Sequence, residues 1–365
     1  MKEGWKYKRL EEICSKGSSN ISLNKIEAND GEYNLYGASG LVKGIDFYHQ
    51  SQQYIGIVKD GSGVGRVNIY PPKSSLVGTM QYIFPNEDCE IGYLKYLLQG
   101  LHLEQFKTGA AIPHIYFKDY GKSIVPIPPL SEQQHIVEEL DLLSSIIEKK
   151  KAQLNELDNL AQSLFYEMFG DPITNEKGWE VKTMNEVCNE IGDGLHGTPQ
   201  YDPNGSIAFI NGNNLIDGKI TITDRTQYVN ETEAKKIFIK MDSNTVLLSI
   251  NGTLGKTAIY NNENVVLGKS ACYLRLSNQL TAFYVMALMN THTFKDFLES
   301  NSSKSTIKNV GLKAIRNYKV ILPSLALQQQ FASKIEAIEH QKELIKQSIK
   351  EVEMLLNSRM DYYFN

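Results

Sequence analysis

The amino-acid sequence predicts an α+β protein with two β-rich domains and two long helices that form an antiparallel coiled coil, the two halves being related by a pseudo-two-fold axis. Two observations lead to this fold class. The chain of 365 residues repeats itself once, in collinear blocks. Each repeat also closes on a long segment without glycine or proline, in which apolar residues recur at alternating three- and four-residue steps. We therefore expect four parts, at 1–130, 131–170, 171–325 and 326–365.

The repeat is visible as short matched blocks. Gly4-Trp5 matches Gly178-Trp179, and Val64-Gly65-Arg66 matches Leu254-Gly255-Lys256. The loops at 59–66 and 249–256 occupy corresponding places. The spacing between matched blocks grows along the chain, so the second repeat is longer by about twenty residues, most of them before its glycine loop.

The first part of each repeat reads as short strands and turns. Runs such as residues 53–58 and 245–250 are rich in Ile, Val, Leu and Tyr, and glycine and asparagine separate them from their neighbours. Short β-branched and aromatic runs between turn residues are typical of strands. This pattern predicts a β-rich domain at 1–130 and another at 171–325.

The second part of each repeat is a helix of about five heptads. Lys150 interrupts the apolar stripe of the first helix, and Lys342 and Arg359 interrupt that of the second. Ser131 and Gln134 have the spacing of a capping box after two prolines, while Ala326 makes the second start weaker. Such a long stripe needs a partner, and the other helix is the nearest match, although pairing between two chains is also open.

Charge is distributed unevenly along the chain. The formal net charge is −4, but residues 131–170 hold 8 acidic and 3 basic side chains, and residues 327–365 hold 6 and 5. The rest of the chain holds 28 acidic and 30 basic residues. The β-rich parts are therefore compatible with binding to a polyanion.

The motifs of common enzymes are missing. Gly255-Lys256-Thr257 and Gly268-Lys269-Ser270 lack the upstream glycine of a phosphate loop, and the histidines and cysteines show no metal-ligand spacing. There is no apolar run long enough for a membrane span and no apolar signal segment, so we expect a cytoplasmic protein. We also expect no catalytic residue, no metal and no cofactor bound by this chain.

What remains is a set of small, polar and basic loops that recur in both repeats. Glycines let a backbone approach a phosphate closely, and the flanking polar side chains can contact phosphates or base edges. A single loop of this kind is equally typical of a plain β-turn, but the recurrence favours a nucleic-acid interface. The side chains expected to contact nucleic acid are, in the first repeat, Tyr36, Ser39, Lys59, Ser62, Arg66, Lys107, Thr108 and His114, and, in the second, His196, Thr198, Asn251, Lys256, Lys304, Ser305 and Lys308.

Over nearly its whole length the chain resembles the DNA-specificity subunit of a type I restriction-modification system. The resemblance rests on the order of several short sequence motifs: Tyr36-Gly37-Ala38-Ser39-Gly40, the segment 108–114, the helix start at 129–134, and the segment 193–199. Leu327 stands where the first helix start has Glu132, which is a departure from the pattern.

The resemblance implies that each β-rich domain is a target-recognition domain that reads one half of a bipartite, asymmetric double-stranded DNA site. It implies that the helices set the spacer between the half-sites and dock two methyltransferase subunits. S-adenosylmethionine would belong to that methyltransferase partner, and ATP and Mg to a separate restriction and translocase subunit.

Three alternatives stay open at the level of sequence. The nearest is the specificity subunit of a related type II system, whose partner is a fused nuclease and methylase. A stand-alone methyltransferase would need a cofactor-binding glycine loop after a strand, and none is convincing. If the chain were a coiled-coil adaptor that does not bind DNA, mutations in the basic loops would not change its function.

Overall fold

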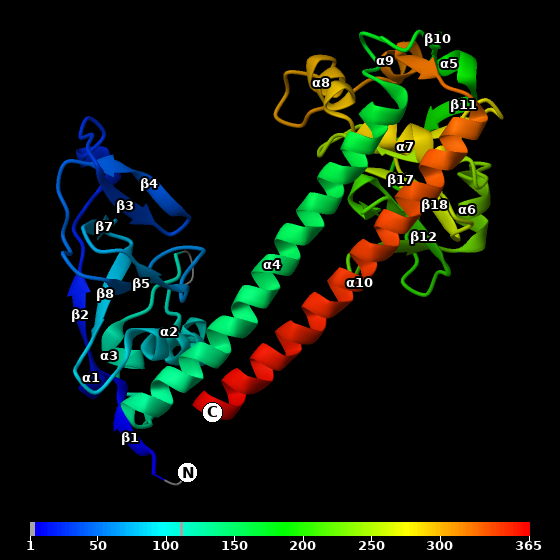
Figure 1. Cartoon of the computed structure of the whole chain (residues 1–365). Helices are drawn as coiled ribbons and strands as arrows, with labels where there is room; N and C mark the ends of the chain where they lie inside the picture. Colours follow the sequence, from blue (N-terminus) through cyan, green and yellow to red (C-terminus); the bar gives the residue numbers. More distant parts are fainter. Residues whose placement is uncertain (1–3, 110–111) are drawn as a thin grey trace. The chain divides into compact units, whose positions relative to one another are not determined.

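A computed structural model describes residues 4–109 and 112–365; Met1 to Glu3, at the start of the first expected domain, and Ala110 and Ala111, within the segment 108–114, lie outside the described residues. The contacts divide the chain into two compact units, and each long helix is shared between them (Figure 1). Unit 1 comprises Met1–Lys151 together with Lys346–Asn365, and unit 2 comprises Ala152–Ile345. No helix within the described ranges is long and apolar enough to cross a membrane.

Unit 1 is built on a four-stranded antiparallel sheet in the order β2-β8-β5-β6, a three-stranded sheet β4-β3-β7, and the pair β1-β9. The strand β5 is buried along its whole length, as its apolar run predicts. The elements in chain order are β1 (Lys6–Arg9), α1 (Leu10–Ile13), β2 (Cys14–Ser18), η1 (Leu23–Lys25), β3 (Tyr33–Gly37), β4 (Gly40–Ile45), β5 (Tyr54–Val58), β6 (Val67–Tyr70), β7 (Ser74–Leu76), β8 (Met80–Pro85), α2 (Ile91–Gly100), η2 (Leu103–Phe106), α3 (Phe117–Tyr120), β9 (Ile124–Ile127) and α4 (Leu130–Phe169).

Unit 2 repeats this topology. Its sheets are β11-β19-β16-β17, β15-β12-β18 and β10-β20, with an added hairpin β13-β14. The elements are β10 (Glu180–Thr183), α5 (Met184–Val187), β11 (Cys188–Asp193), β12 (Ile207–Ile210), η3 (Gly212–Asn214), β13 (Leu215–Ile216), β14 (Lys219–Ile220), β15 (Gln227–Val229), α6 (Glu231–Lys236), β16 (Thr245–Ser249), β17 (Thr257–Ile259), β18 (Val265–Leu267), β19 (Ala271–Leu276), α7 (Ala282–Asn290), α8 (His292–Ser300), α9 (Leu312–Asn317), β20 (Lys319–Leu322) and α10 (Leu325–Phe364).

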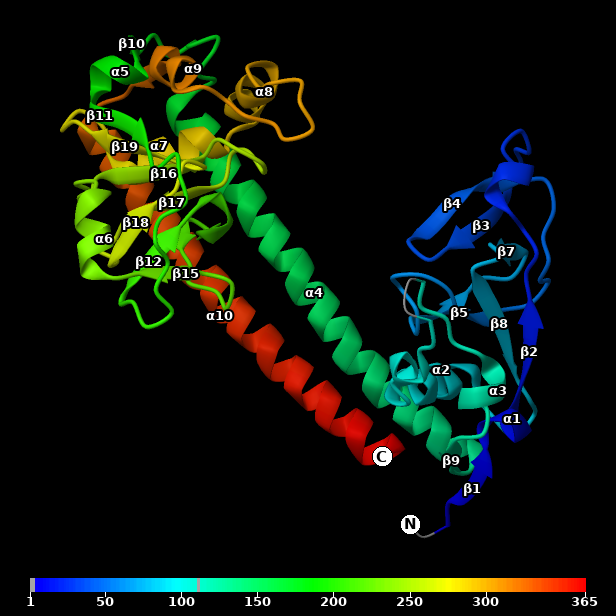
Figure 2. The same ribbon diagram turned by 180° about the vertical axis from the view of Figure 1, so that it is seen from behind.

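The correspondence extends to strand direction. β3 is antiparallel to β4 and parallel to β7, and β12 is antiparallel to β15 and parallel to β18. The hairpin β13-β14 and the helix α6 lie between β12 and β16 in sequence, which is where the longer second repeat was expected to carry its extra residues. In unit 2 the sheet β15-β12-β18 and α6 gather at the end away from β10 and α9 (Figure 2).

Within unit 2 the two helices run antiparallel. Nζ of Lys342 on α10 lies 2.8 Å from Oδ1 of Asp158 on α4. Farther along α4, the rings of Phe165 and Phe169 pack on Phe331, which lies earlier on α10, at centroid distances of 6.0 and 5.1 Å. The antiparallel helix pairing predicted from the sequence is therefore confirmed, and Lys342, which interrupts the apolar stripe, is paired with an acid across the seam.

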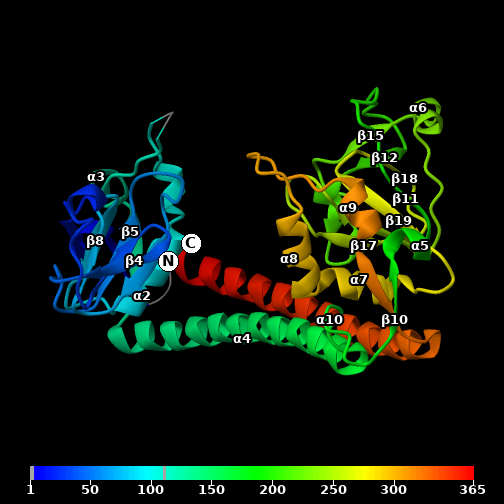
Figure 3. The same cartoon turned by 90° about the horizontal axis from the view of Figure 1, so that it is seen from above.

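Within unit 1, Arg359 also interrupts the apolar stripe of α10 and is also paired with an acid on α4. Arg359 on α10 binds both carboxylate oxygens of Glu139 on α4, at 2.5 and 2.9 Å. The hydroxyl of Tyr363 also donates to this carboxylate. In Figure 3 the red ribbon of α10 ends at the point marked C. Near this end, five residues past Arg359, the buried ring of Phe364 packs against Tyr93 of α2, with centroids 5.4 Å apart. The end of α10 is thus part of the core of unit 1.

The start of each long helix is fixed by a buried glutamine rather than by the expected capping box. The Gln133 amide accepts from the backbone N–H of Glu90 and donates to the carbonyls of Pro128 and Asp88. Because α4 already begins at Leu130, Ser131 lies in its first turn and the expected cap at Ser131 is wrong. The residue that anchors the helix start is the first glutamine of the motif, since only its side chain points into the domain.

The equivalent glutamine does the same in unit 2. Gln328 accepts from the N–H of Thr281 and donates to the carbonyls of Pro323 and Gln279. Both glutamine side chains are fully buried, and each ties a long helix to the residue that precedes the shorter helix α2 or α7. The weaker-looking start of the second helix is therefore anchored as firmly as the first.

Candidate nucleic-acid interface

The glycine loop of unit 1 is a closed turn between β5 and β6. The N–H of Val58 donates to the carbonyl of Arg66 at 3.0 Å, and the N–H of Gly65 donates back to Val58 at 2.9 Å. Gly61 and Gly65 both have φ of +93°, which a side chain disfavours. An added Cβ at Gly61 would meet nothing within 4 Å, so this glycine serves the turn. The turn leaves Ser62 and Arg66 exposed.

A second segment of unit 1 pairs with this loop. The N–H of Ile115 donates to the carbonyl of Lys59, and the N–H of Gly61 donates to Pro113, both at 3.0 Å. This pairing places Nδ1 of His114 2.7 Å from Oδ1 of Asp60. Nζ of Lys59 lies 3.8 Å from the other oxygen of Asp60. The structure thus brings two of the predicted residues, Lys59 and His114, together around a carboxylate.

The loop of unit 2 is closed by the same hydrogen bonds. The N–H of Ser249 donates to the carbonyl of Lys256 at 2.8 Å, and Gly255 donates back to Ser249 at 3.0 Å. The N–H of Val310 donates to Ile250, and the N–H of Gly252 donates to Lys308, both at 2.9 Å. Gly252 and Gly255 again have positive φ.

These matched bonds align the two loops residue by residue. Asp60, between the bonded positions 59 and 61, corresponds to Asn251, between 250 and 252. His114 corresponds to Asn309 in the same way, and Nδ2 of Asn251 lies 3.4 Å from Oδ1 of Asn309. The matched sequence blocks 59–66 and 249–256 predict that Lys59 corresponds to Ser249. The hydrogen bonds instead show that Val58 corresponds to Ser249, because the first loop holds one residue more.

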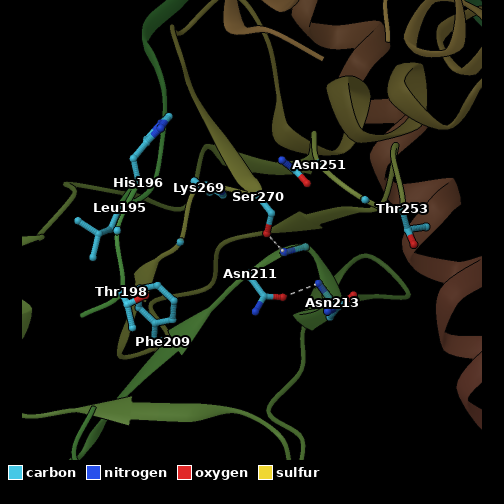
Figure 4. Close-up of a pocket in the computed structure, with 14 residues that line it drawn as sticks. Leu195, His196, Thr198, Phe209, Asn211, Asn213, Asn251, Thr253, Lys269 and Ser270 are labelled. Carbon is cyan, nitrogen blue, oxygen red and sulfur yellow. Dashed lines mark hydrogen bonds between the residues drawn. The ribbon is translucent and has the colours of Figure 1, made fainter. Parts of the chain in front are cut away.

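Asn251 also lines a pocket in unit 2 (Figure 4). The pocket has a volume of about 560 Å³, and four loops form it. Its lining residues are Leu195, His196, Gly197, Thr198, Phe209, Asn211, Gly212, Asn213, Asn251, Gly252, Thr253, Gly268, Lys269 and Ser270. Three predicted residues, His196, Thr198 and Asn251, therefore meet at one place, although Asn251 is more than fifty residues from the other two in sequence.

The side chains of this pocket are oriented by local hydrogen bonds. Nε2 of His196 lies 2.7 Å from Oδ2 of Asp193, and Oδ1 of Asn211 accepts from the N–H of Asn213 at 2.9 Å. Oγ of Ser270 accepts from the N–H of Gly212 at 3.0 Å. Lys269 is exposed and adds a positive charge to the lining. The pocket offers amides, hydroxyls, an imidazole and an ammonium group, which is the set of groups that contacts bases and phosphates.

Sequence reasoning missed Asn211, Asn213, Lys269 and Ser270. In the linear sequence Gly268-Lys269-Ser270 matches only the end of a phosphate loop and lacks its upstream glycine. The bonds that bring this segment to the pocket are non-local: Gly268 donates to Ile210, and Lys269 donates to Leu195. No signal in the linear sequence indicates those contacts.

The other predicted residues lie in different surroundings. The ring of Tyr36 packs 4.8 Å from that of Tyr70, and Ser39 is exposed in the turn between β3 and β4. Lys107 and Thr108 are exposed, and Thr108 bridges to His114. In unit 2, Lys256 closes the glycine loop without lining the pocket, and Lys304, Ser305 and Lys308 are exposed on the segment that pairs with it. Nζ of Lys308 lies 2.5 Å from a carboxylate oxygen of Glu299.

The thiols and acids do not form a reactive or metal-binding cluster in the described part of the chain. Burial raises the pKa of the thiols of Cys14, Cys89 and Cys188 to about 12, so these thiols are protonated at neutral pH. Among residues 4–109 and 112–365, no group of three His, Cys, Asp or Glu side chains could hold a metal ion. The polar loops are thus the chemically distinctive surfaces.

Known proteins resemble this chain in sequence. The chain is 20% identical over 259 residues to the type I restriction enzyme EcoBI specificity subunit of Escherichia coli, covering 63% of this chain and 54% of that protein. It is 24% identical over 286 residues to the MjaIX specificity subunit of Methanocaldococcus jannaschii, covering 70% of this chain and 64% of that one. The chain therefore spans less than two thirds of these two relatives.

Two solved structures share the fold over almost the whole chain. The type I restriction-modification S subunit from M. genitalium superposes with a TM-score of 0.58 at 15% identity, covering 99% of this chain and 96% of that one. A chain from a study of complex assembly and conformational transition of the type I restriction-modification system superposes with a TM-score of 0.58 at 18% identity. This match covers 99% of this chain and 97% of that one. A family model described as the type I restriction modification DNA specificity domain matches residues 2–159 and again residues 176–354. The chain therefore belongs to the family of type I restriction-modification DNA specificity domains and contains two copies of this domain.

Proposed function

We propose that this chain is the DNA-recognition subunit of a type I restriction-modification complex. In this proposal the loops of unit 1 read one half of a bipartite, asymmetric site and the loops of unit 2 read the other half. The observation that carries the proposal is the duplicated pairing of a glycine loop with a second polar segment, closed by the same backbone bonds in both units. Similar scaffolds with different side chains suit the recognition of two different half-sites.

The long helices would set the spacer and dock two methyltransferase subunits. In support, α4 and α10 carry large apolar side chains that are exposed in this chain: Leu142, Leu160, Leu344, Met354, Leu355 and Tyr362. Exposed apolar residues gathered on two helices favour contact with a protein partner. A restriction and translocase subunit would join the same complex.

The chain itself would be non-catalytic in this proposal. S-adenosylmethionine would be bound by the methyltransferase partner, and ATP and Mg by the restriction partner. The relatives and the family model are all described as type I, which favours this system over a type II system with a fused nuclease and methylase.

Binding and methylation assays test the proposal. The full chain should bind duplex DNA with an affinity that falls steeply with salt, and addition of a type I methyltransferase partner should give methylation within one bipartite motif. The chain alone, incubated with DNA and labelled S-adenosylmethionine, should transfer no methyl group. Methyl transfer by the chain alone, or a complex that methylates without sequence preference, would contradict the proposal.

A further inference from the structure

The two paired loops carry different side chains at two positions where their backbone hydrogen bonds match. Unit 1 places Asp60 beside His114, and unit 2 places Asn251 beside Asn309, at positions that the same backbone hydrogen bonds define. Asp60, His114 and Asn251 are partly exposed, and Asn309 is exposed. Resting on the proposed function, we infer that this pair of positions determines which bases each domain selects, and that the exchange of Asp-His for Asn-Asn is a main reason for the difference between the half-sites.

The pair in unit 1 presents hydrogen-bond acceptors. Oδ1 of Asp60 lies 2.7 Å from Nδ1 of His114, and an ionised carboxylate can only accept, so the proton of this bond sits on Nδ1. In the neutral form of the ring Nε2 is an acceptor, and Oδ2 of Asp60, 3.8 Å from Nζ of Lys59, is a second acceptor. The imidazole is half-exposed, with 36% of the side chain accessible. Acceptors match the exocyclic amine of cytosine or adenine and repel the O6 and N7 acceptors of guanine.

The pair in unit 2 presents donors and acceptors together. Nδ2 of Asn251 donates one N–H to Oδ1 of Asn309 at 3.4 Å. The oxygen and the second N–H of Asn251, and both N–H groups of Asn309, remain available for a base. An asparagine that offers one donor and one acceptor matches N6 and N7 of adenine. Asn251 also lines the polar pocket, together with Thr253, Asn211 and Lys269. The two units therefore present different chemistry from one scaffold.

Reciprocal exchange of the pairs tests the inference. The full chain is expressed with a methyltransferase partner in a host without adenine methylation, and the methylated motif is read by single-molecule sequencing. The double variant Asp60→Asn, His114→Asn should change one or two adjacent base pairs of one half-site only. The variant Asn251→Asp, Asn309→His should change the other half-site only. In binding assays, the preference of each variant for the original over the altered half-site should fall by roughly 5- to 150-fold, the range expected when one good base pairing is removed.

A matched control carries the same side-chain changes outside the loops. Asp88 is exposed and pairs with Lys8, and His135 is exposed on α4. Asp88→Asn with His135→Asn should leave the methylated motif unchanged. Circular dichroism shows whether each variant is folded. If a double variant does not fold, the corresponding single variant, Asp60→Asn or Asn309→His, is used in its place.

The outcomes separate this inference from the proposed function. Folded exchange variants that methylate the wild-type motif, or that lose affinity for all sequences equally, would overturn the inference while the proposed function stands. A relaxed motif confined to one half-site would support it, since removal of a base reader relaxes one position. A wild-type complex without any bipartite motif would overturn both.

Discussion

The ring of Phe364 packs 5.4 Å from that of Tyr93 inside the core of unit 1, although more than two thirds of the chain separates them in sequence. Phe169 holds the corresponding place against Tyr284 in unit 2, at 4.8 Å. The hydroxyl groups of both tyrosines donate to a backbone carbonyl of the strand before a long helix, Tyr93 to Pro126 and Tyr284 to Ile321. Each unit is therefore completed by the end of the helix that begins in the other unit.

The first prediction follows from this closure. Phe364→Ala should destabilise unit 1 by about 3–5 kcal/mol, the usual cost of removing a buried phenylalanine ring, and should leave unit 2 unchanged. The chain has two tryptophans, Trp5 packed on the core of unit 1 and Trp179 on that of unit 2. Urea unfolding followed by fluorescence in Trp179→Phe and Trp5→Phe backgrounds separates the units. Met354→Ala, at an exposed site on α10, is the control, and equal destabilisation of both units would contradict the prediction.

The second prediction concerns the glutamines that anchor the helix starts. Gln133→Ala would leave the N–H of Glu90 and the carbonyl of Asp88 without their partner, so the unfolding free energy of unit 1 should fall by about 1–3 kcal/mol. Gln134 is exposed, and Gln134→Ala should change stability by less than about 0.5 kcal/mol. Gln328→Ala should act in the same way on unit 2. Similar effects at the two neighbouring glutamines, measured by urea unfolding, would show that burial of Gln133 is unimportant.

The third prediction is a pH dependence. The Arg359 guanidinium that hydrogen-bonds Glu139 holds the pKa of that carboxyl below its ordinary value of 4.5. Because the folded-state pKa is lowered, the ionised Glu139 stabilises the fold above pH 4.5, and this contribution is lost as the pH falls through the folded-state pKa. The stability difference between wild type and Glu139→Gln should therefore be largest near neutral pH and disappear in acid. Glu156→Gln, at an exposed site on α4, is the matched control. A stability difference that is independent of pH would exclude the ion pair as the cause.

The fourth prediction concerns the binding of DNA phosphates by the basic loops. Arg66→Ala combined with Lys256→Ala should weaken binding to every duplex and reduce the slope of log affinity against log salt by about 1 for each phosphate that is no longer neutralised. Lys149→Ala with Lys151→Ala removes two exposed charges from α4 and serves as the control. Affinity and salt slope are measured by fluorescence anisotropy from low to physiological salt. If both quantities stay at the wild-type values in the loop variant, the loops are only turns.

The fifth prediction tests the helices as a ruler. One heptad inserted after Lys151 and a matching heptad inserted after Ile345 preserve both the apolar stripe and the antiparallel partners Glu139–Arg359 and Asp158–Lys342. Seven residues add about 10 Å to each helix, so the spacer of the methylated motif should grow by about 3 base pairs while both half-sites stay the same. An active, folded variant with the original spacer would refute the ruler.

The sequence was sufficient wherever the signal is periodic or repeated. The duplicated blocks predicted two copies of one topology, and the heptad stripe predicted two long helices within about one residue of their observed bounds. The periodic spacing of apolar residues can be read from the linear sequence because successive turns of one helix bury the same face. The glycine loops are also visible in the sequence, because a turn with positive φ favours glycine and this preference is local.

Only the tertiary structure decided which side chains meet. Asp60 reaches His114, Asn251 reaches Asn309, and Lys269 reaches the pocket through backbone bonds between segments that are distant in sequence. Likewise the interruptions at Lys342 and Arg359 look like defects of the stripe until Asp158 and Glu139 are found opposite them. The physical reason is that a side chain's partner across a sheet edge or a helix seam depends on strand order and register, which the whole fold sets and no short stretch of sequence records.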